Sequence, residues 1–185
     1  LKEFPAFSRM CDGRHLPSAT LAVKALQQEE VRVKKQYFEL NRLIERLHRR
    51  FIDVLKTELN RIGVRNINGV QALLLSNIGE EKITIRDLVE RGYYLGSNVS
   101  YNIKKLTDLG YLNQEPTPHD RRSVTVSLTE KALEVVRSLR EVQDQNAVAF
   151  SNQGGGPEDI DEICKRLKAL ERTWSDYISY GDEAA

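Results

Sequence analysis

The segment from residue 84 to residue 129 constrains the fold of this chain more than any other. It begins with two stretches of helical periodicity, which the sequence Gly-Tyr-Tyr at residues 92–94 separates. Two short stretches of strand-forming residues follow, and the charged loop His119-Asp120-Arg121-Arg122 lies between them. The expected order of elements is therefore helix, turn, helix, strand, loop and strand.

The first helix of this segment is short and has signals at both ends. Thr84 and Asp87 have the spacing of a capping box, and the apolar residues Ile85 and Leu88 follow the cap. Gly92 is placed to end the helix, because glycine readily adopts the left-handed backbone that follows a helix. We therefore expect a helix of about two turns between Thr84 and Gly92.

The second helix has one apolar and one polar face, and Ser97 or Asn98 is expected to cap it. Its apolar residues recur every three or four positions: Leu95, Val99, Ile103 and Leu106. Its polar residues are Ser97, Asn98, Ser100, Tyr101, Lys104 and Lys105. Short polar groups suit the edges of DNA bases and lysines suit phosphates, so this pattern favours a recognition helix. A solvated amphipathic helix has the same pattern, and the helix alone does not decide between them.

The two strand-forming stretches cover residues 112–114 and 124–128, and Pro116 and Pro118 are expected to rigidify the start of the loop. The second stretch alternates apolar and polar residues, as a strand covered on one side does. The loop tip, His119-Asp120-Arg121-Arg122, could be only a solvated turn. Beside a polar-faced helix, however, a double arginine favours contact with DNA. We therefore predict a mainly α winged helix-turn-helix with a small antiparallel β-hairpin wing.

The same residues resemble the MarR family of bacterial transcriptional regulators. That family's second helix has the form S-x-x-[TS]-x-x-hydrophobic-x-x-L and is followed by glycine and a hydrophobic residue. The matching residues here are Ser97, Ser100, Ile103, Leu106, Gly110 and Tyr111. The family's wing has D-x-R, then a strand and L-T-x-x-[GA], and the matching residues are Asp120, Arg122, Leu128, Thr129 and Ala132.

The resemblance extends over residues 69–133, and just upstream Asn68, Gln71 and Leu74 resemble the start of the preceding helix. The chain departs from the family pattern at Gly92-Tyr93-Tyr94 and at Ala132, where glycine is common, and these departures bear on the local turn geometry. Within the family, LdtR-type regulators are the nearest relatives that the resemblance suggests. The resemblance implies a homodimer, a pseudo-palindromic double-stranded DNA operator, and a small aromatic or anionic effector bound between the dimerisation helices and the winged domain.

Two further apolar stripes lie outside the winged segment. One runs through an expected helix over residues 21–62 and consists of Val33, Tyr37, Leu40, Ile44, Leu47, Phe51 and Val54. The other lies near the C-terminus and consists of Ile160, Ile163, Leu167, Leu170, Trp174 and Tyr177. They could bury into one monomeric core, but helices this long exceed what a small winged domain covers. We therefore expect dimerisation through them, with Ile163, Leu167, Leu170, Trp174 and Tyr177 in the interface.

The expected organisation is an N-terminal arm (1–20), a dimerisation helix (21–65), the winged domain (66–128) and a helical dimerisation region (129–185), in which residues 154–157 break the chain between two helices. Net charge is +1 overall, but residues 31–65 carry +6 and residues after 129 carry −5, so an acidic end can point away from DNA.

The residues indicate no catalytic site. His15, His48 and His119 lie far apart in the sequence, and Cys11 and Cys164 lack metal-site spacing, so we expect no enzyme activity, no cofactor and no metal. No apolar run is long enough to span a bilayer, which favours a soluble cytoplasmic protein without a membrane partner. Two hypotheses remain: a ligand-responsive, dimeric, sequence-specific DNA-binding regulator, and a winged-helix protein–protein interaction module with coiled-coil arms that does not bind DNA.

Overall fold

The computed structural model describes residues 19–92, 96–117 and 120–181. The chain divides into two compact units, residues 1–50 and residues 51–185. The first helix, α1 (Ala19–Arg61), begins in the first unit and ends in the second. None of the described helices combines the length and apolar character that crossing a membrane requires.

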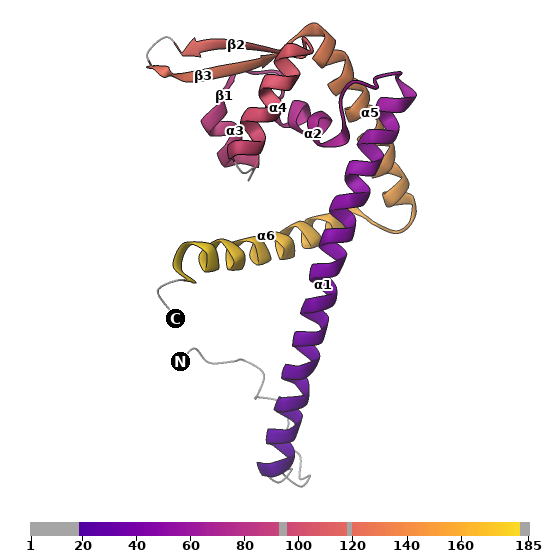
Figure 1. Cartoon of the computed structure of the whole chain (residues 1–185). Coiled ribbons are helices and arrows are strands. Elements are labelled where there is room, and N and C mark those ends of the chain that lie inside the picture. The colour runs from indigo at the N-terminus through magenta and orange to yellow at the C-terminus, as the bar shows by residue number, and fades with distance from the viewer. Residues whose placement is uncertain (1–18, 93–95, 118–119, 182–185) are drawn as a thin grey trace. The chain divides into compact units, whose positions relative to one another are not determined.

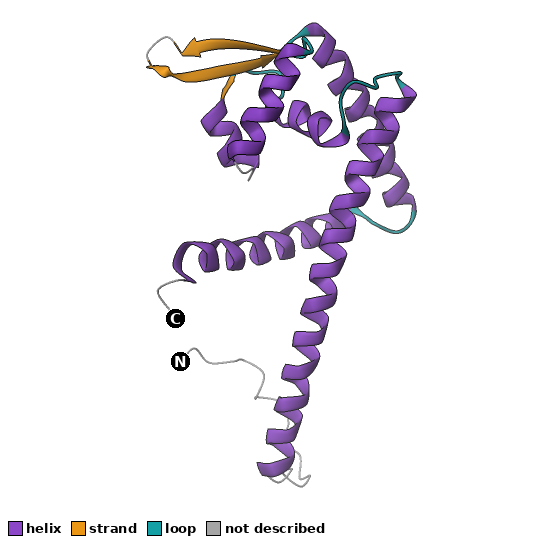
Figure 2. Ribbon diagram, in the orientation of Figure 1, coloured by secondary structure: helices purple, strands orange, loops and turns teal. Residues whose placement is uncertain are grey.

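The second unit contains the other helices and a three-stranded sheet (Figures 1 and 2). After α1 come α2 (Gly69–Ile78), β1 (Ile83–Thr84), α3 (Ile85–Gly92), α4 (Gly96–Asp108), β2 (Leu112–Thr117), β3 (Asp120–Leu128), α5 (Glu130–Asn152) and α6 (Pro157–Tyr180). The sheet is antiparallel and has the strand order β1-β3-β2. This is the mainly α winged helix-turn-helix that the sequence predicts, with β2 and β3 as the wing.

The start and the length of α3 follow the prediction, whereas the start of α4 does not. The Thr84 hydroxyl accepts a hydrogen bond from the Asp87 amide at 3.0 Å, and α3 ends at Gly92. The expectation that Ser97 or Asn98 caps α4 is wrong, because α4 already begins at Gly96 and both residues lie in its first turn. The expected turn residues 93–95 lie outside the described residues.

The wing is longer than the sequence predicts. β2 continues through Pro116, which pairs with Val124, and the register shifts only between Pro116 and Thr117. Proline is tolerated there because β2 is an edge strand. On the outer side of β2 no further strand needs a hydrogen bond from the backbone nitrogen of Pro116. Pro118, expected beside it in the loop, lies outside the described residues.

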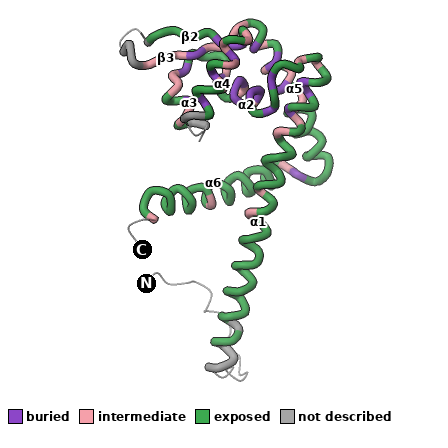
Figure 3. Tube along the Cα trace, viewed as in Figure 1, coloured by how far each residue is buried: buried purple, intermediate pink, exposed green. Residues whose placement is uncertain are grey.

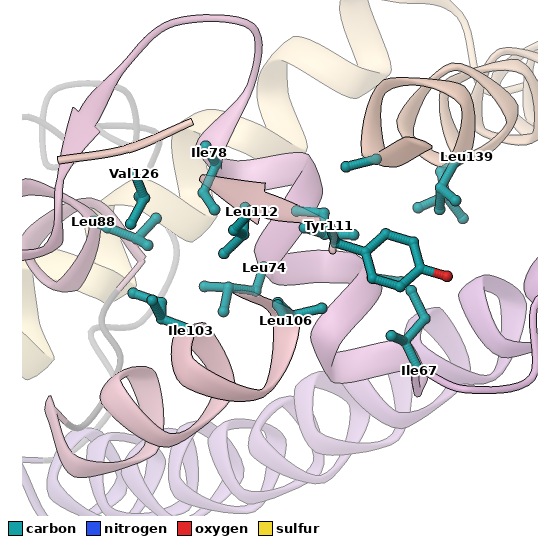
Figure 4. Close-up of a cluster of buried hydrophobic side chains, with 14 of the residues drawn as sticks. Ile67, Leu74, Ile78, Leu88, Ile103, Leu106, Tyr111, Leu112, Val126 and Leu139 are labelled. Carbon is teal, nitrogen blue, oxygen red and sulfur yellow. The ribbon is translucent and has the colours of Figure 1, made fainter. Parts of the chain in front are cut away.

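One apolar core joins α2, α3, α4, the sheet, α5 and the last turns of α1 (Figure 4). The predicted apolar stripe of α4 forms part of it, since Val99, Ile103 and Leu106 are at most 2% exposed. Leu55 contributes from α1 and Leu139 from α5, and both are fully buried. The core therefore holds the apolar side of α4 and leaves its other side outward.

The corner between α4 and α5 is fixed by polar contacts around Tyr111. The ring is buried, and its hydroxyl donates to the Asn66 side chain at 2.8 Å, so the phenol is satisfied. The Lys131 ammonium lies 4.1 Å from the ring centroid and donates to the Leu109 carbonyl at 2.9 Å. The Thr129 side chain accepts from the Ala132 amide and caps α5. Its hydroxyl also donates to the Gly110 carbonyl at 2.8 Å, which ties the end of β3 to this corner.

Two different faces of α1 carry apolar residues. The face that packs into the core consists of Ile52, Leu55, Leu59 and Ile62. The predicted heptad stripe lies on the neighbouring side of the helix, and Tyr37, Leu40, Leu47 and Phe51 on it are 37–57% exposed. The exposed residues of the stripe leave an apolar surface along this part of α1.

The apolar stripe of α6 is uncovered as well (Figure 3). No residue of this helix is buried, and Ile163, Leu167, Trp174 and Tyr177 are 39–77% exposed, while Leu170 is half-buried. The break that separates α6 from α5 is confirmed, with Gly154 at a φ of +96° and Pro157 as the first helical residue. Burying such a stripe against another chain would remove a large apolar surface from water.

Candidate nucleic-acid interface

The outward side of α4 carries most of the predicted recognition residues. Asn98, Ser100, Tyr101 and Lys104 are exposed, and Lys105 is half-buried. Tyr101 is the large aromatic side chain among them, and it is 66% exposed. Ser97 lies in the first turn of α4, but its side chain lies outside the described set. The described face thus presents amide and hydroxyl groups toward its N-terminal end and ammonium groups toward its C-terminal end, a distribution that suits base edges and phosphates.

The wing places its charged residues at the far end of the hairpin. Asp120 opens β3 and pairs with Thr117, whereas Leu112 and Leu128 pair at the opposite end. Arg121 and Arg122 follow Asp120 directly in β3, so their backbone lies at the hairpin tip. The side chains of residues 120–122 and the whole of His119 lie outside the described set.

Polar side chains join α2 to the inner side of α4, and the sequence did not predict these contacts. Gln71 of α2 is 1% exposed, and its side-chain amide donates to the Asn102 side chain of α4 at 3.1 Å. Asn102 in turn donates to the Asn98 carbonyl at 2.8 Å. The spacing of Asn68 and Gln71 is a recognisable capping-box signal, but nothing in the sequence points to Asn102 as the partner.

The start of α2 is held closely against α1. A Cβ atom added at Gly69 would lie 2.7 Å from the Ile52 carbonyl oxygen, so only glycine permits this approach. The Asn68 side chain accepts from the Gln71 amide and completes the capping box of α2. The helix that carries Gln71 therefore has a fixed position on the last part of α1.

A buried carboxylate joins α1 to α5. Glu58 is 4% exposed and accepts hydrogen bonds from two Arg61 nitrogens, at 2.6 and 2.7 Å, and from the Ser138 hydroxyl at 2.6 Å. The hydrogen bond from Arg61 lowers the pKa of the Glu58 carboxyl, although burial opposes this shift. Three donors thus stabilise the ionised form, and the network holds α1 and α5 together in the winged domain.

A family model described as a winged helix DNA-binding domain matches residues 67–132, which include α2, α3, α4 and the wing. The chain is 35% identical over 145 residues to the exopolysaccharide II synthesis transcriptional activator ExpG of Rhizobium meliloti, covering 78% of this chain and 75% of that protein.

Solved structures share the fold at lower identity. A mutant of MarR from E. coli complexed with operator DNA has a TM-score of 0.60 and 19% identity, over 73% of this chain and 95% of that one. BpsR of Bordetella bronchiseptica, solved to explain regulation of its DNA binding by 6-hydroxynicotinic acid, has a TM-score of 0.56 and 20% identity, over 71% of this chain and 91% of that one.

Proposed function

Because the chain belongs to the MarR family of winged-helix transcriptional regulators, we propose that it binds a pseudo-palindromic DNA operator as a homodimer. We further propose that a small molecule modulates this binding. The proteins to which the chain is similar are transcriptional regulators and not enzymes. The polar outward face of α4 is the observation that carries the proposal. An interaction module would instead present an apolar patch there, and Tyr101 is the one large apolar side chain among the described residues of this face.

The proposed contacts divide by position on α4 and on the wing. Base edges are read near the N-terminal end of the helix, by Ser97, Asn98, Ser100 and Tyr101. Lys104 and Lys105 lie toward the C-terminal end and contact phosphates. The wing contacts the neighbouring minor groove or backbone through His119, Asp120, Arg121 and Arg122, with Asp120 bracing Arg122.

The exposed stripes support the homodimer. Tyr37, Leu40, Leu47 and Phe51 of the α1 stripe are exposed, and they are not among the residues that form or flank the apolar core. The stripe of α6 is equally uncovered, and Leu167 and Trp174 at its centre are the proposed anchors. Two recognition helices related by a two-fold axis would then meet half-sites about one turn of DNA apart, roughly 34–36 Å.

The proposed effector site lies beside the end of α1 and the start of α2, and the proposed effector is a small aromatic or anionic molecule. A hollow of about 370 Å³ beside the end of α1 and the start of α2 is lined by the apolar residues Leu59 and Ile67 and by the cations Lys56 and Arg65. Apolar walls with a few charged groups suit an aromatic acid. Occupation of this region would change the spacing of the recognition helices rather than cover the DNA face.

Selection from a pool of double-stranded oligonucleotides of randomised sequence tests the proposal. The protein should enrich an inverted repeat whose half-site centres are about 10 base pairs apart. A gel-shift titration on the enriched duplex, with and without an aromatic acid such as 6-hydroxynicotinic acid, then tests modulation. Failure to enrich any sequence would favour the interaction module.

A further inference from the structure

The side-chain amide of Gln71 is buried inside the winged domain. Gln71 and Glu58 are the buried polar or charged side chains among the described residues. Burying an amide is unfavourable unless its donor and acceptor groups find partners. Glu58 joins α1 to α5, so its role is structural. Gln71 instead forms a hydrogen bond with Asn102 of α4, the helix with the outward polar face.

The capping box accounts for only half of the Gln71 side chain. Its Oε1 accepts from the Asn68 backbone amide at 3.1 Å, which is the usual contact of such a box. A glutamate would make that contact equally well. The Nε2 group is the additional feature, and it donates to the Asn102 Oδ1 at 3.1 Å. A glutamate lacks this donor at neutral pH, so the contact with α4 requires glutamine.

The direction of the whole hydrogen-bond chain is fixed by its two backbone ends. The Asn98 carbonyl can only accept, so the Asn102 Nδ2 must face it, at 2.8 Å. The Asn102 Oδ1 is then left to face Gln71. At the other end the Asn68 amide can only donate, so the Gln71 oxygen faces Asn68 and its nitrogen faces Asn102. Neither side-chain amide can rotate by half a turn without losing two partners.

These hydrogen bonds restrict the rotation of α4 about its own axis, which the apolar core restricts only weakly. The stripe of Val99, Ile103 and Leu106 holds α4 by non-directional contacts, which tolerate small rotations of the helix about its axis. Asn102 lies one turn after Asn98 on the same side of α4, at the border between the stripe and the outward face. A directional hydrogen bond at this border fixes the rotation. Gln71 lies on α2, and the start of α2 packs closely against the Ile52 carbonyl of α1. The hydrogen bond therefore sets the rotation of α4 relative to the last part of α1.

We propose that Gln71 and Asn102 are positioning residues for DNA sequence readout: their hydrogen bond sets the rotation of α4 and so decides which side chains meet the base edges. The inference rests on the proposed function, since it requires α4 to be the recognition helix. Neither residue contacts DNA in this account. Their loss should therefore reduce discrimination between operator sequences more than it reduces affinity for DNA in general.

The test uses the full-length protein and the sequence enriched from a randomised duplex pool. Gln71→Met keeps the size of the side chain and removes both polar groups, and Asn102→Leu does the same on α4. The ratio of dissociation constants between the enriched duplex and single-base variants measures discrimination. We expect each variant to lower that ratio about fivefold, and the double variant to lower it no further, because contacting residues act as one unit.

Ser138→Ala is the matched control for lost stability. It removes the hydrogen bond that Ser138 donates to the buried Glu58 carboxylate and the one that it accepts from Arg61, both within the α1–α5 network. It should lower the melting temperature and leave the discrimination ratio unchanged. If Gln71→Met does not fold, Asn102→Leu carries the same test, because Asn102 is only half-buried.

The outcomes separate the inference from the function on which it rests. Variants that melt earlier but keep the wild-type discrimination ratio would overturn the positioning role and leave DNA binding intact. Additive losses in the double variant would also overturn it, since the two residues would then act independently. A wild-type protein that enriches no sequence would overturn the proposed function, and the positioning role with it.

Discussion

Ser138 on α5 donates a 2.6 Å hydrogen bond to the buried carboxylate of Glu58 on α1, a contact that spans 80 positions of the sequence. Arg61, on the next turn of α1, donates to the same carboxylate with two nitrogens. The carboxylate is thus ionised and shared by two helices that have no sequence motif in common. This relationship fastens the frame of the winged domain and makes its stability depend on pH.

The pH dependence follows from the lowered pKa of Glu58 in the folded state. Its hydrogen bonds stabilise the fold fully above the unfolded-state pKa, near 4.5, and this contribution is lost as the pH falls through the lower folded-state pKa. Glu58→Ala should lower the free energy of unfolding by about 1–3 kcal/mol at neutral pH. Urea unfolding at several pH values between neutrality and about pH 3 measures this. The gap between wild type and variant should narrow below the unfolded-state pKa, and a constant gap would show that the ionised carboxylate is not the source.

The wing arginine is expected to contribute to DNA affinity and not to folding. Arg122→Ala should weaken binding to the enriched duplex by about 1–3 kcal/mol, because a contact in the minor groove or with a phosphate is lost. Thermal stability should stay at the wild-type value. Arg140→Ala is the control, since Arg140 lies on α5 in an exposed ion pair, 3.9 Å from Glu80. Equal affinities for wild type and Arg122→Ala would remove the wing from the mechanism.

The two ends of the α4 face should differ in what they recognise. Lys104→Gln should reduce the salt dependence of binding by about one unit of slope, because one phosphate contact is lost, and it should weaken all sequences alike. Asn98→Ala should instead change the preference among single-base variants of the operator. Fluorescence anisotropy titrations at several salt concentrations distinguish the two effects. An Asn98→Ala protein that loses affinity equally for every sequence would contradict this division of roles.

The sequence predicted the elements of the winged domain well because their signals are local. Thr84 with Asp87 and the spacing of Val99, Ile103 and Leu106 each act within a few residues, and the structure confirms them. The predicted start of α4 was wrong. Several neighbouring residues can begin a helix at this point, and the sequence alone does not select among them.

The supporting contacts of the site could not be predicted because they join distant residues. Gln71 and Asn102 are 31 positions apart, and their pairing depends on the packing of α2 against α4. The same holds for Tyr111 and Asn66, which are 45 positions apart. Likewise the periodicity of α1 shows that it has an apolar stripe, but only the structure shows that the core uses the neighbouring face, with Leu55 and Leu59.

The apolar stripe of α6 should be required for assembly. Leu167→Glu would place an unpaired charge in the proposed interface, so we expect monomers or unfolded protein and a steep loss of operator binding. Ala169→Glu is the matched control, because it adds the same charge on the opposite side of α6. If Leu167→Glu assembled and bound as the wild type does, α6 would not be part of the interface.

The most direct test of the central claim is the mass of the complex between the wild-type protein and its enriched duplex, measured by sedimentation at micromolar protein concentration. Each chain has a mass of 21.2 kDa. We predict two chains on each duplex, and a free protein that already sediments as a dimer. A free protein that sediments as a single chain and binds the duplex tightly with one copy would contradict the account.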